Sequence, residues 1–161
     1  MRTIVTVSGN IGYRHQLDRV RRFLDRFEGP NANDVEFQDI AWSFFQHCWH
    51  LKDWVRNDPL ASDAQKTAII DQVHASAVLK ICRDLCNGTK HLGLDRRPGS
   101  GSGAAHDHVA ITIVPGGSST IDCIVQDGFG NPTSGKQLAR DCVKDWERIL
   151  QSQQLNTTRL S

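Results

Sequence analysis

The fold follows first from residues 35–57, VEFQDIAWSFFQHCWHLKDWVRN. Apolar side chains recur in this stretch every three or four positions, which is the period of an α-helix. A continuous apolar stripe contains Phe37, Ala41, Phe44, Cys48, Leu51 and Val55, and another side contains Trp42, Phe45 and Trp49. A helix that is apolar over most of its circumference is typical of the middle of a helical bundle. Its remaining polar stripe consists of Gln46, His50, Asp53 and Asn57.

Helical periodicity also occurs on both sides of this central segment. Residues 14–27 form an amphipathic helix that Gly29-Pro30 ends. Residues 64–92 continue the pattern as one helix or as two, and Gly88 indicates a helix end or a close packing contact nearby. A last helix covers residues 134–150. Helix starts are indicated by a capping residue three positions before Glu or Gln in the pairs Asn33/Glu36, Ser62/Gln65 and Ser134/Gln137.

The composition changes between the third helical region and the last helix. Residues 95–105, DRRPGSGSGAA, have the composition of a mobile loop. Two runs rich in Val, Ile and Thr, 108–114 and 120–126, flank a Pro-Gly-Gly-Ser-Ser turn, so we predict a β-hairpin over residues 108–126. A second turn region follows at residues 127–132, and we expect the polar tail from Gln151 to fray.

These segments together predict a mainly α fold, a four- to five-helix bundle with a β-hairpin inserted before the C-terminal helix. We expect a single domain over residues 1–161, with its helical core at about 14–94 and 134–150. A chain of this length buries enough surface to fold without disulfides or structural metals.

The charge and composition exclude several classes of function. The 19 basic and 18 acidic residues give a formal net charge of +1, so contact with nucleic acid would need a local patch. The longest apolar run, 109–114, is far shorter than the roughly 18 residues that cross a bilayer. We therefore expect a cytoplasmic protein without a signal peptide or membrane contact.

No motif indicates a cofactor, and the five cysteines form no CxxC pair, so we expect buried thiols.

A candidate site lies in residues 80–91. At helical spacing, a polar edge opposite the apolar face contains Lys80, Arg83, Asp84, Asn87, Lys90 and His91. Arginine offers a forked set of donors to phosphate oxygens, and histidine exchanges protons near neutral pH. The edge therefore indicates either a phosphate-binding site or simply the solvated face of an amphipathic helix.

A second candidate lies on the polar stripe of the central helix. His50 and Asp53 are one turn apart and could complete a four-ligand metal site with Asp84 and His91. The alternative is a hydrogen-bond network in which the two carboxylates orient the imidazoles. A further pair, His106 and His108, could chelate a metal in an extended segment or be exposed polar side chains.

With these helices and residues 83–91 placed, the chain resembles a HEPN-type domain. Domains of this family are small helical bundles in many prokaryotic toxins, defence proteins and nucleic-acid-associated proteins. The resemblance covers about residues 14–94 and 134–150 and rests on the bundle pattern and on Arg83-Asp84 followed by His91. Active members have four to six residues between Arg and His, whereas seven separate Arg83 from His91. The chain also resembles unassigned bacterial proteins with HLKDW and NGTKH segments.

The resemblance implies two functions that stay open at this point. If the family's chemistry applies, the chain is a metal-independent ribonuclease, acting as a homodimer. His91 would then exchange the proton with a ribose 2′-hydroxyl, and Arg83 would stabilise the charge on the phosphate. Otherwise the chain is a binding or regulatory module whose partner is an RNA or a protein. The near-neutral charge and the longer Arg-to-His spacing favour the module.

Overall fold

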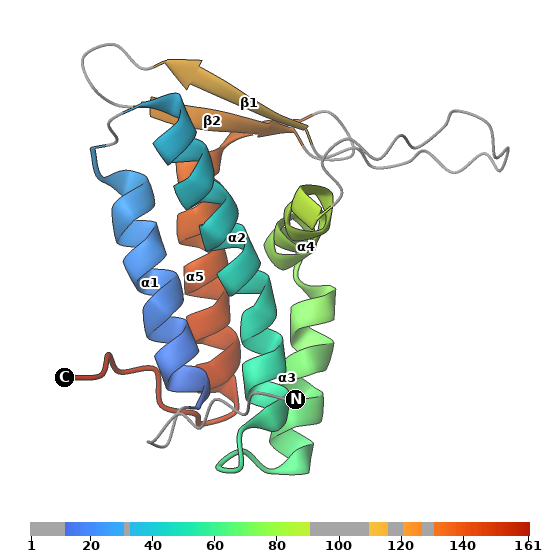
Figure 1. Ribbon diagram of the computed structural model, residues 1–161. Helices are drawn as coiled ribbons and strands as arrows, with labels where there is room; N and C mark the ends of the chain where they lie inside the picture. The colour runs from blue at the N-terminus through green and yellow to red at the C-terminus, as the bar shows by residue number, and fades with distance from the viewer. Residues whose placement is uncertain (1–11, 31–32, 91–109, 116–120, 127–130) are drawn as a thin grey trace, which may run out of the picture.

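The computed structural model confirms a mainly α bundle with a hairpin before the last helix (Figure 1). It describes residues 12–30, 33–90, 110–115, 121–126 and 131–161, with the main chain alone for 88–90 and 110–115. The helices are α1 (Tyr13–Glu28), α2 (Asp34–Asn57), α3 (Asp63–Ala75), α4 (Ala77–Lys90) and α5 (Gly135–Ser152). The strands are β1 (Ala110–Pro115), β2 (Ile121–Gln126) and β3 (Pro132–Ser134).

Helix α2 lies at the centre of the bundle, as its sequence predicts. It packs against α1 and α5 on one side and against α3 and α4 on the other (Figure 1). Its apolar positions are buried on two faces, with Phe44, Phe45 and Leu51 completely inaccessible. Each of the other helices contributes one apolar face, so a single core forms around α2.

Side-chain caps define the starts of several helices. The Asn33 side chain accepts a hydrogen bond from the Glu36 N–H at 2.9 Å, and Ser62 and Gln65 form a complete capping box. The Ser134 hydroxyl accepts from the Gln137 N–H at 3.2 Å. Each cap satisfies a main-chain N–H that the helix leaves without a partner. The three caps expected from the sequence are therefore confirmed.

The region that the sequence left as one helix or two is two helices. They meet at Ser76, whose backbone is extended (φ −66°, ψ 125°). The Ser76 hydroxyl accepts from the Leu79 N–H at 3.1 Å and is hydrogen-bonded to the Asp145 carboxylate of α5. Ser76 therefore ends α3, caps α4 and ties the break to α5.

The sheet is antiparallel in the order β1-β2-β3, and it lies across one end of the bundle (Figure 1). Ile113 pairs with Cys123, and Val125 pairs with Thr133. The third strand was not expected: it begins at Pro132, the last residue of the predicted turn, and pairs with β2 up to Ser134, where the last helix was predicted to begin. A Cβ at Gly135 would lie 2.1 Å from the Cys123 sulfur, so only glycine allows α5 to start this close to β2.

The expectation that the tail frays from Gln151 is wrong. Helix α5 continues to Ser152, and Gln154 turns the chain with a positive φ of 60°. The tail then lies against α1, where the Tyr13 hydroxyl donates to the Asn156 carbonyl at 2.9 Å and the Leu160 N–H donates to Asp18 at 2.8 Å. The polar composition of the tail does not predict these contacts, because main-chain groups of the tail make them.

Three further expectations concern the cysteines, membrane-spanning segments and the predicted mobile loop. All five cysteines are buried free thiols, as expected. None of the described helices is both long and apolar enough to cross a membrane. The predicted mobile loop 95–105 and the last residues of the 64–92 segment lie outside the described residues.

Candidate nucleic-acid interface

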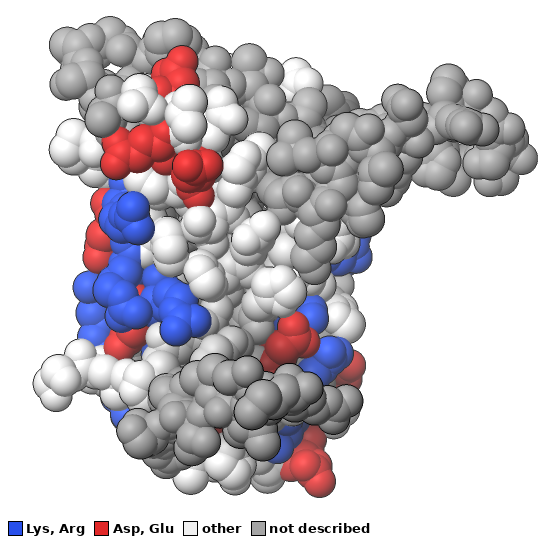
Figure 2. Space-filling model, viewed as in Figure 1, with Lys and Arg blue, Asp and Glu red and all other residues white. Residues whose placement is uncertain are grey.

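A row of basic side chains follows the outer face of α1. Arg19, Arg22 and Arg26 recur at spacings of three and four, so they lie on one side of the helix. Arg22 and Arg26 are exposed and Arg19 is half-buried. Figure 2 shows Lys and Arg side chains gathered over α1 on this side of the molecule.

Aromatic rings lie beside these arginines, between α1 and α2. The Arg26 guanidinium carbon lies 5.3 Å from the centroid of the Phe23 ring, and the Phe23 ring stacks on His47 at 4.9 Å. The Arg19 guanidinium lies 5.7 Å from the Trp54 ring. Rings and guanidinium groups therefore alternate across the two helices. We call this set the basic–aromatic surface: Arg19, Arg22, Phe23, Arg26, His47 and Trp54.

Within the described part of the chain, Arg19, Arg22 and Arg26 form no ion pair. The acids of α1 are engaged elsewhere, because Asp18 pairs with Arg21 at 3.0 Å and Asp25 lies 3.6 Å from Arg159. A cationic face of this kind attracts anions even though the whole chain is almost neutral.

His47 joins the two helices of the surface. Its carbonyl accepts a hydrogen bond from the Gln16 side chain at 2.9 Å. The pKa of its imidazole is lowered from the ordinary value because burial disfavours the charged ring, and Arg19 and His50 add positive charge beside it. His47 is therefore mainly neutral at neutral pH, which suits a stacking platform.

The predicted edge in residues 80–91 is only partly described. The Arg83 Nε donates to the neighbouring Asp84 carboxylate at 2.8 Å, so Asp84 offsets its charge. Lys80 and Asn87 are exposed, as on a solvated helix face. The Lys90 side chain and His91 lie outside the described residues. Whether Arg83 and His91 converge therefore stays a prediction.

The second candidate pair does come together. His50 Nδ1 lies 3.2 Å from an Asp53 carboxylate oxygen, and His50 Nε2 lies 3.9 Å from the Cys86 sulfur of α4. Burial acts to raise the pKa of the Asp53 carboxyl, but hydrogen bonds from Lys52 and His50 outweigh it, so this pKa is lowered. The Asp53 carboxylate orients the His50 ring, as the network interpretation expects, although both side chains are 40% exposed.

Among the described residues, His50, Asp53 and Asp84 do not gather into a group that could hold a metal. The fourth ligand of that hypothesis, His91, and the pair His106 and His108 lie outside the described residues. The four-ligand site therefore stays a prediction.

Comparisons with known proteins identify no relative of this chain. No family model, no curated protein and no solved structure matches the chain.

The basic–aromatic surface was not predicted from the sequence. Its members lie on two helices, and the Arg19–Trp54 contact joins residues far apart in the chain. The signal that could have indicated it was the spacing of Arg19, Arg22 and Arg26 along one face of the first helix.

Proposed function

We propose that this protein is a helical RNA-binding module whose contact surface is the basic–aromatic surface of α1 and α2. The observation that carries the proposal is the stacking of Arg26 on Phe23 and of Arg19 on Trp54, with neither arginine in an ion pair within the described residues. Guanidinium groups bind phosphate oxygens, and aromatic rings stack on unpaired bases. We name RNA rather than DNA as the ligand because the resemblance to HEPN-type domains implies RNA.

The form of the ligand follows from the form of the surface. Half-buried rings between two helices suit stacking on splayed, single-stranded bases, whereas double-stranded RNA is recognised mostly by its shape and phosphates. The proposed ligand is therefore single-stranded RNA, bound without strong sequence preference.

Binding is favoured here over cleavage. The Asp84 carboxylate holds the Arg83 guanidinium, which a ribonuclease mechanism needs free for phosphate. The ribonuclease using Arg83 and His91 and the homodimer both stay predictions of the resemblance. Urea gels of labelled RNA, run with the Arg83→Ala, His91→Ala double variant alongside, test for cleavage in the same preparations.

Fluorescence anisotropy with labelled oligouridine of about 20 nucleotides tests the proposed function. We expect the triple variant Arg19→Gln, Arg22→Gln, Arg26→Gln to weaken binding at least about tenfold, because three phosphate contacts are lost. Glutamine retains part of the stem that packs on the rings. The slope of log affinity against log salt should fall by about 2, at about 0.7 for each contact.

The matched control removes three basic side chains from other faces, with Lys66→Gln, Lys144→Gln and Arg148→Gln. It lowers the net charge equally and should leave the salt slope almost unchanged. A third variant, Lys80→Gln with Arg83→Gln, tests the predicted edge of α4. Equal losses in the first two variants would show that net charge, and not the basic–aromatic surface, governs binding.

A further inference from the structure

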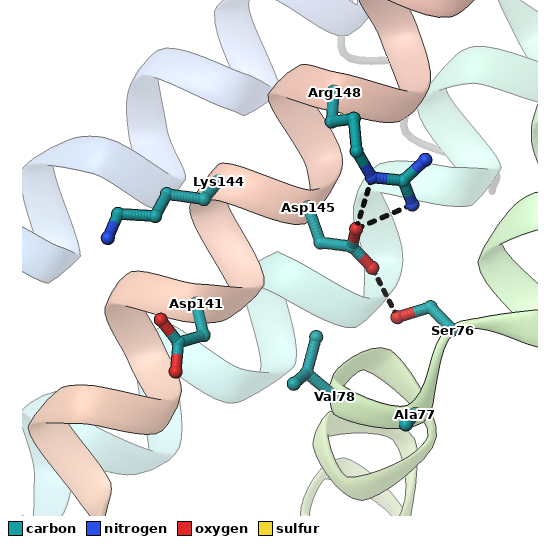
Figure 3. Close-up of a pocket in the computed structure, with 7 residues that line it drawn as sticks. All are labelled: Ser76, Ala77, Val78, Asp141, Lys144, Asp145 and Arg148. Atoms are coloured by element: carbon teal, nitrogen blue, oxygen red, sulfur yellow. Dashed lines mark hydrogen bonds and ion pairs between the residues drawn. The ribbon is translucent and has the colours of Figure 1, made fainter.

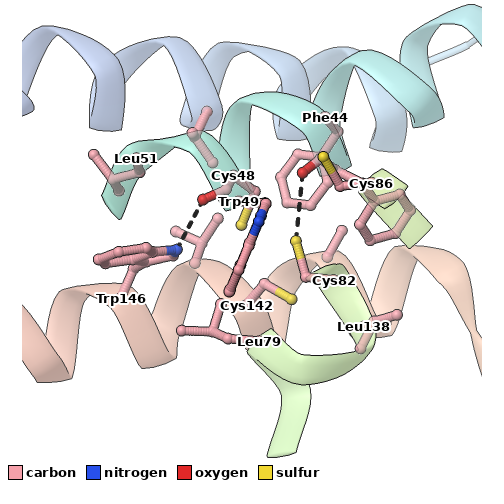
Figure 4. Close-up of a cluster of buried hydrophobic side chains, with 14 of the residues drawn as sticks. Phe44, Cys48, Trp49, Leu51, Leu79, Cys82, Cys86, Leu138, Cys142 and Trp146 are labelled. Carbon is pink, nitrogen blue, oxygen red and sulfur yellow. Dashed lines mark hydrogen bonds between the residues drawn. The ribbon is translucent and has the colours of Figure 1, made fainter. Parts of the chain in front are cut away.

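Three cysteines from three helices meet in the core. Cys48 of α2, Cys82 of α4 and Cys142 of α5 are completely inaccessible to solvent, and their sulfur atoms all lie within 4.8 Å of one another. In Figure 4 the three sulfurs lie between the facing helices, among apolar side chains that include Leu79 and Leu138. The cysteines are free thiols, so no disulfide accounts for their approach.

Hydrogen bonds hold this cluster in position. The Cys82 thiol donates to the Phe45 carbonyl at 3.4 Å, and the Cys142 thiol donates to the Val78 carbonyl at 3.7 Å. The Trp146 indole N–H donates to the Cys48 carbonyl at 3.1 Å, which fixes α5 against α2 (Figure 4). Three sulfur ligands are therefore arranged by the fold itself before any ion binds.

We propose that Cys48, Cys82 and Cys142 form a three-coordinate site for a soft monovalent metal ion, Cu(I). Thiolate sulfur is the ligand type that selects Cu(I) in proteins. A metal about 2.3 Å from each of three sulfurs in one plane places them about 4 Å apart, which the cluster allows with little movement. Each thiol that binds as a thiolate releases its proton to water.

The number of ligands separates Cu(I) from zinc. Structural zinc sites are almost always tetrahedral with four ligands. In the described part of the chain, no fourth His, Cys, Asp or Glu joins the three cysteines. Cys86 is not part of the cluster, and its sulfur lies 3.9 Å from His50 Nε2.

A surface pocket shares one residue, Val78, with the surroundings of Cys142. It has a volume of about 380 Å³ and lies between the start of α4 and α5 (Figure 3). Its lining carries both charges, since Asp141 and Asp145 lie there with Lys144 and Arg148. It also includes Val78, whose carbonyl accepts from the Cys142 thiol.

Anaerobic titration of the full chain with Cu(I) against a competing chelator tests the site. We expect one equivalent of Cu(I) to be withdrawn from the chelator. Cys48→Ala, Cys82→Ala and Cys142→Ala should each weaken retention at least about a hundredfold, because two sulfurs hold the ion less well than three. Cys123→Ala and Cys86→Ala are matched controls, since both thiols are buried outside the cluster, and they should retain the metal.

A second measurement uses the unaltered protein and does not depend on how the variants fold. X-ray absorption at the copper edge should show three sulfur neighbours and no nitrogen. Failure to withdraw copper, a nitrogen ligand, or retention undiminished in all three cluster variants would overturn the proposal. Tighter binding of Zn²⁺ than of Cu(I) would overturn it as well, because the ligand number would then be wrong.

Discussion

At the scale of single residues, His47 shows how packing and charge act on one side chain. Its ring stacks on Phe23 of α1, and burial together with Arg19 and His50 lowers the pKa of the imidazole. The folded protein therefore binds a proton at His47 less readily than the unfolded chain does. Wherever the unfolded chain binds more protons, the free energy of unfolding decreases as the pH falls.

We therefore predict that His47 contributes a loss of stability that begins as the pH falls below about 6.5, the ordinary value, and ends below the lowered pKa. Urea denaturation at about pH 7.5 and pH 5.5 measures it. The midpoint of the His47→Gln variant should fall less between the two pH values than that of the unaltered protein. The exposed His15→Gln variant should keep the full decrease, and a full decrease in His47→Gln as well would contradict this interpretation.

At the scale of elements, the break between α3 and α4 depends on Ser76. This residue is 8% exposed, and its hydroxyl both caps α4 and bonds to Asp145 of α5. We predict that Ser76→Ala lowers the free energy of unfolding by about 2 kcal/mol, because a helix cap and a bond to a carboxylate are lost together. Chemical denaturation followed by circular dichroism gives the value.

Ser62→Ala is the matched control for this prediction. Ser62 also caps a helix, α3, but it is exposed, and within the described residues its hydroxyl makes no contact beyond that helix start. Its loss should cost about 1 kcal/mol, the usual value of a cap alone. Equal costs at the two serines would show that the bond to Asp145 adds nothing to stability.

The elements differ in how far the sequence could predict them. Periodicity predicted helices at 14–27 and 35–57. The structure places α1 at Tyr13–Glu28 and α2 at Asp34–Asn57, so both predictions are correct to within one residue at each end. The position of the break at Ser76 was not predictable, because neither glycine nor proline interrupts the apolar period there. Strand β3 escaped prediction because it has three residues and exists only through its pairing with β2.

The candidate site was less predictable than the fold for a related reason. A helix face can be read from spacing, so the row Arg19, Arg22 and Arg26 was present in the sequence. The rings that complete it, His47 and Trp54, come from α2, and only the packing angle of α1 on α2 brings them beside the arginines. The cysteine cluster likewise needs three helices to be placed before its members meet.

At the scale of the whole molecule, the C-terminal tail joins the two ends of the described chain. Arg21 is a buried residue, 7% exposed, and its guanidinium donates to Asp18, to Glu147 of α5 and to the Thr157 carbonyl of the tail. The tail thus completes the hydrogen bonding of a buried charge between α1 and α5. A buried charged group that loses a partner costs more than an ordinary surface contact.

Deleting residues 156–161 should therefore destabilise the whole bundle and not the tail alone. The deletion removes the acceptors of Tyr13 and Arg21 and the N–H that Asp18 accepts from, while it keeps Leu155, which packs on the core. We predict a loss of about 2 kcal/mol, which lowers Tm by roughly 5 °C in a domain of this size. Differential scanning calorimetry measures the shift.

Thr158→Ala is the control, because it keeps the Thr158 carbonyl that accepts from Arg14 and should leave Tm unchanged. An unchanged Tm in the deletion variant would mean that water replaces the tail at Arg21 without cost, and that the bundle of helices α1 to α5 is stable without it.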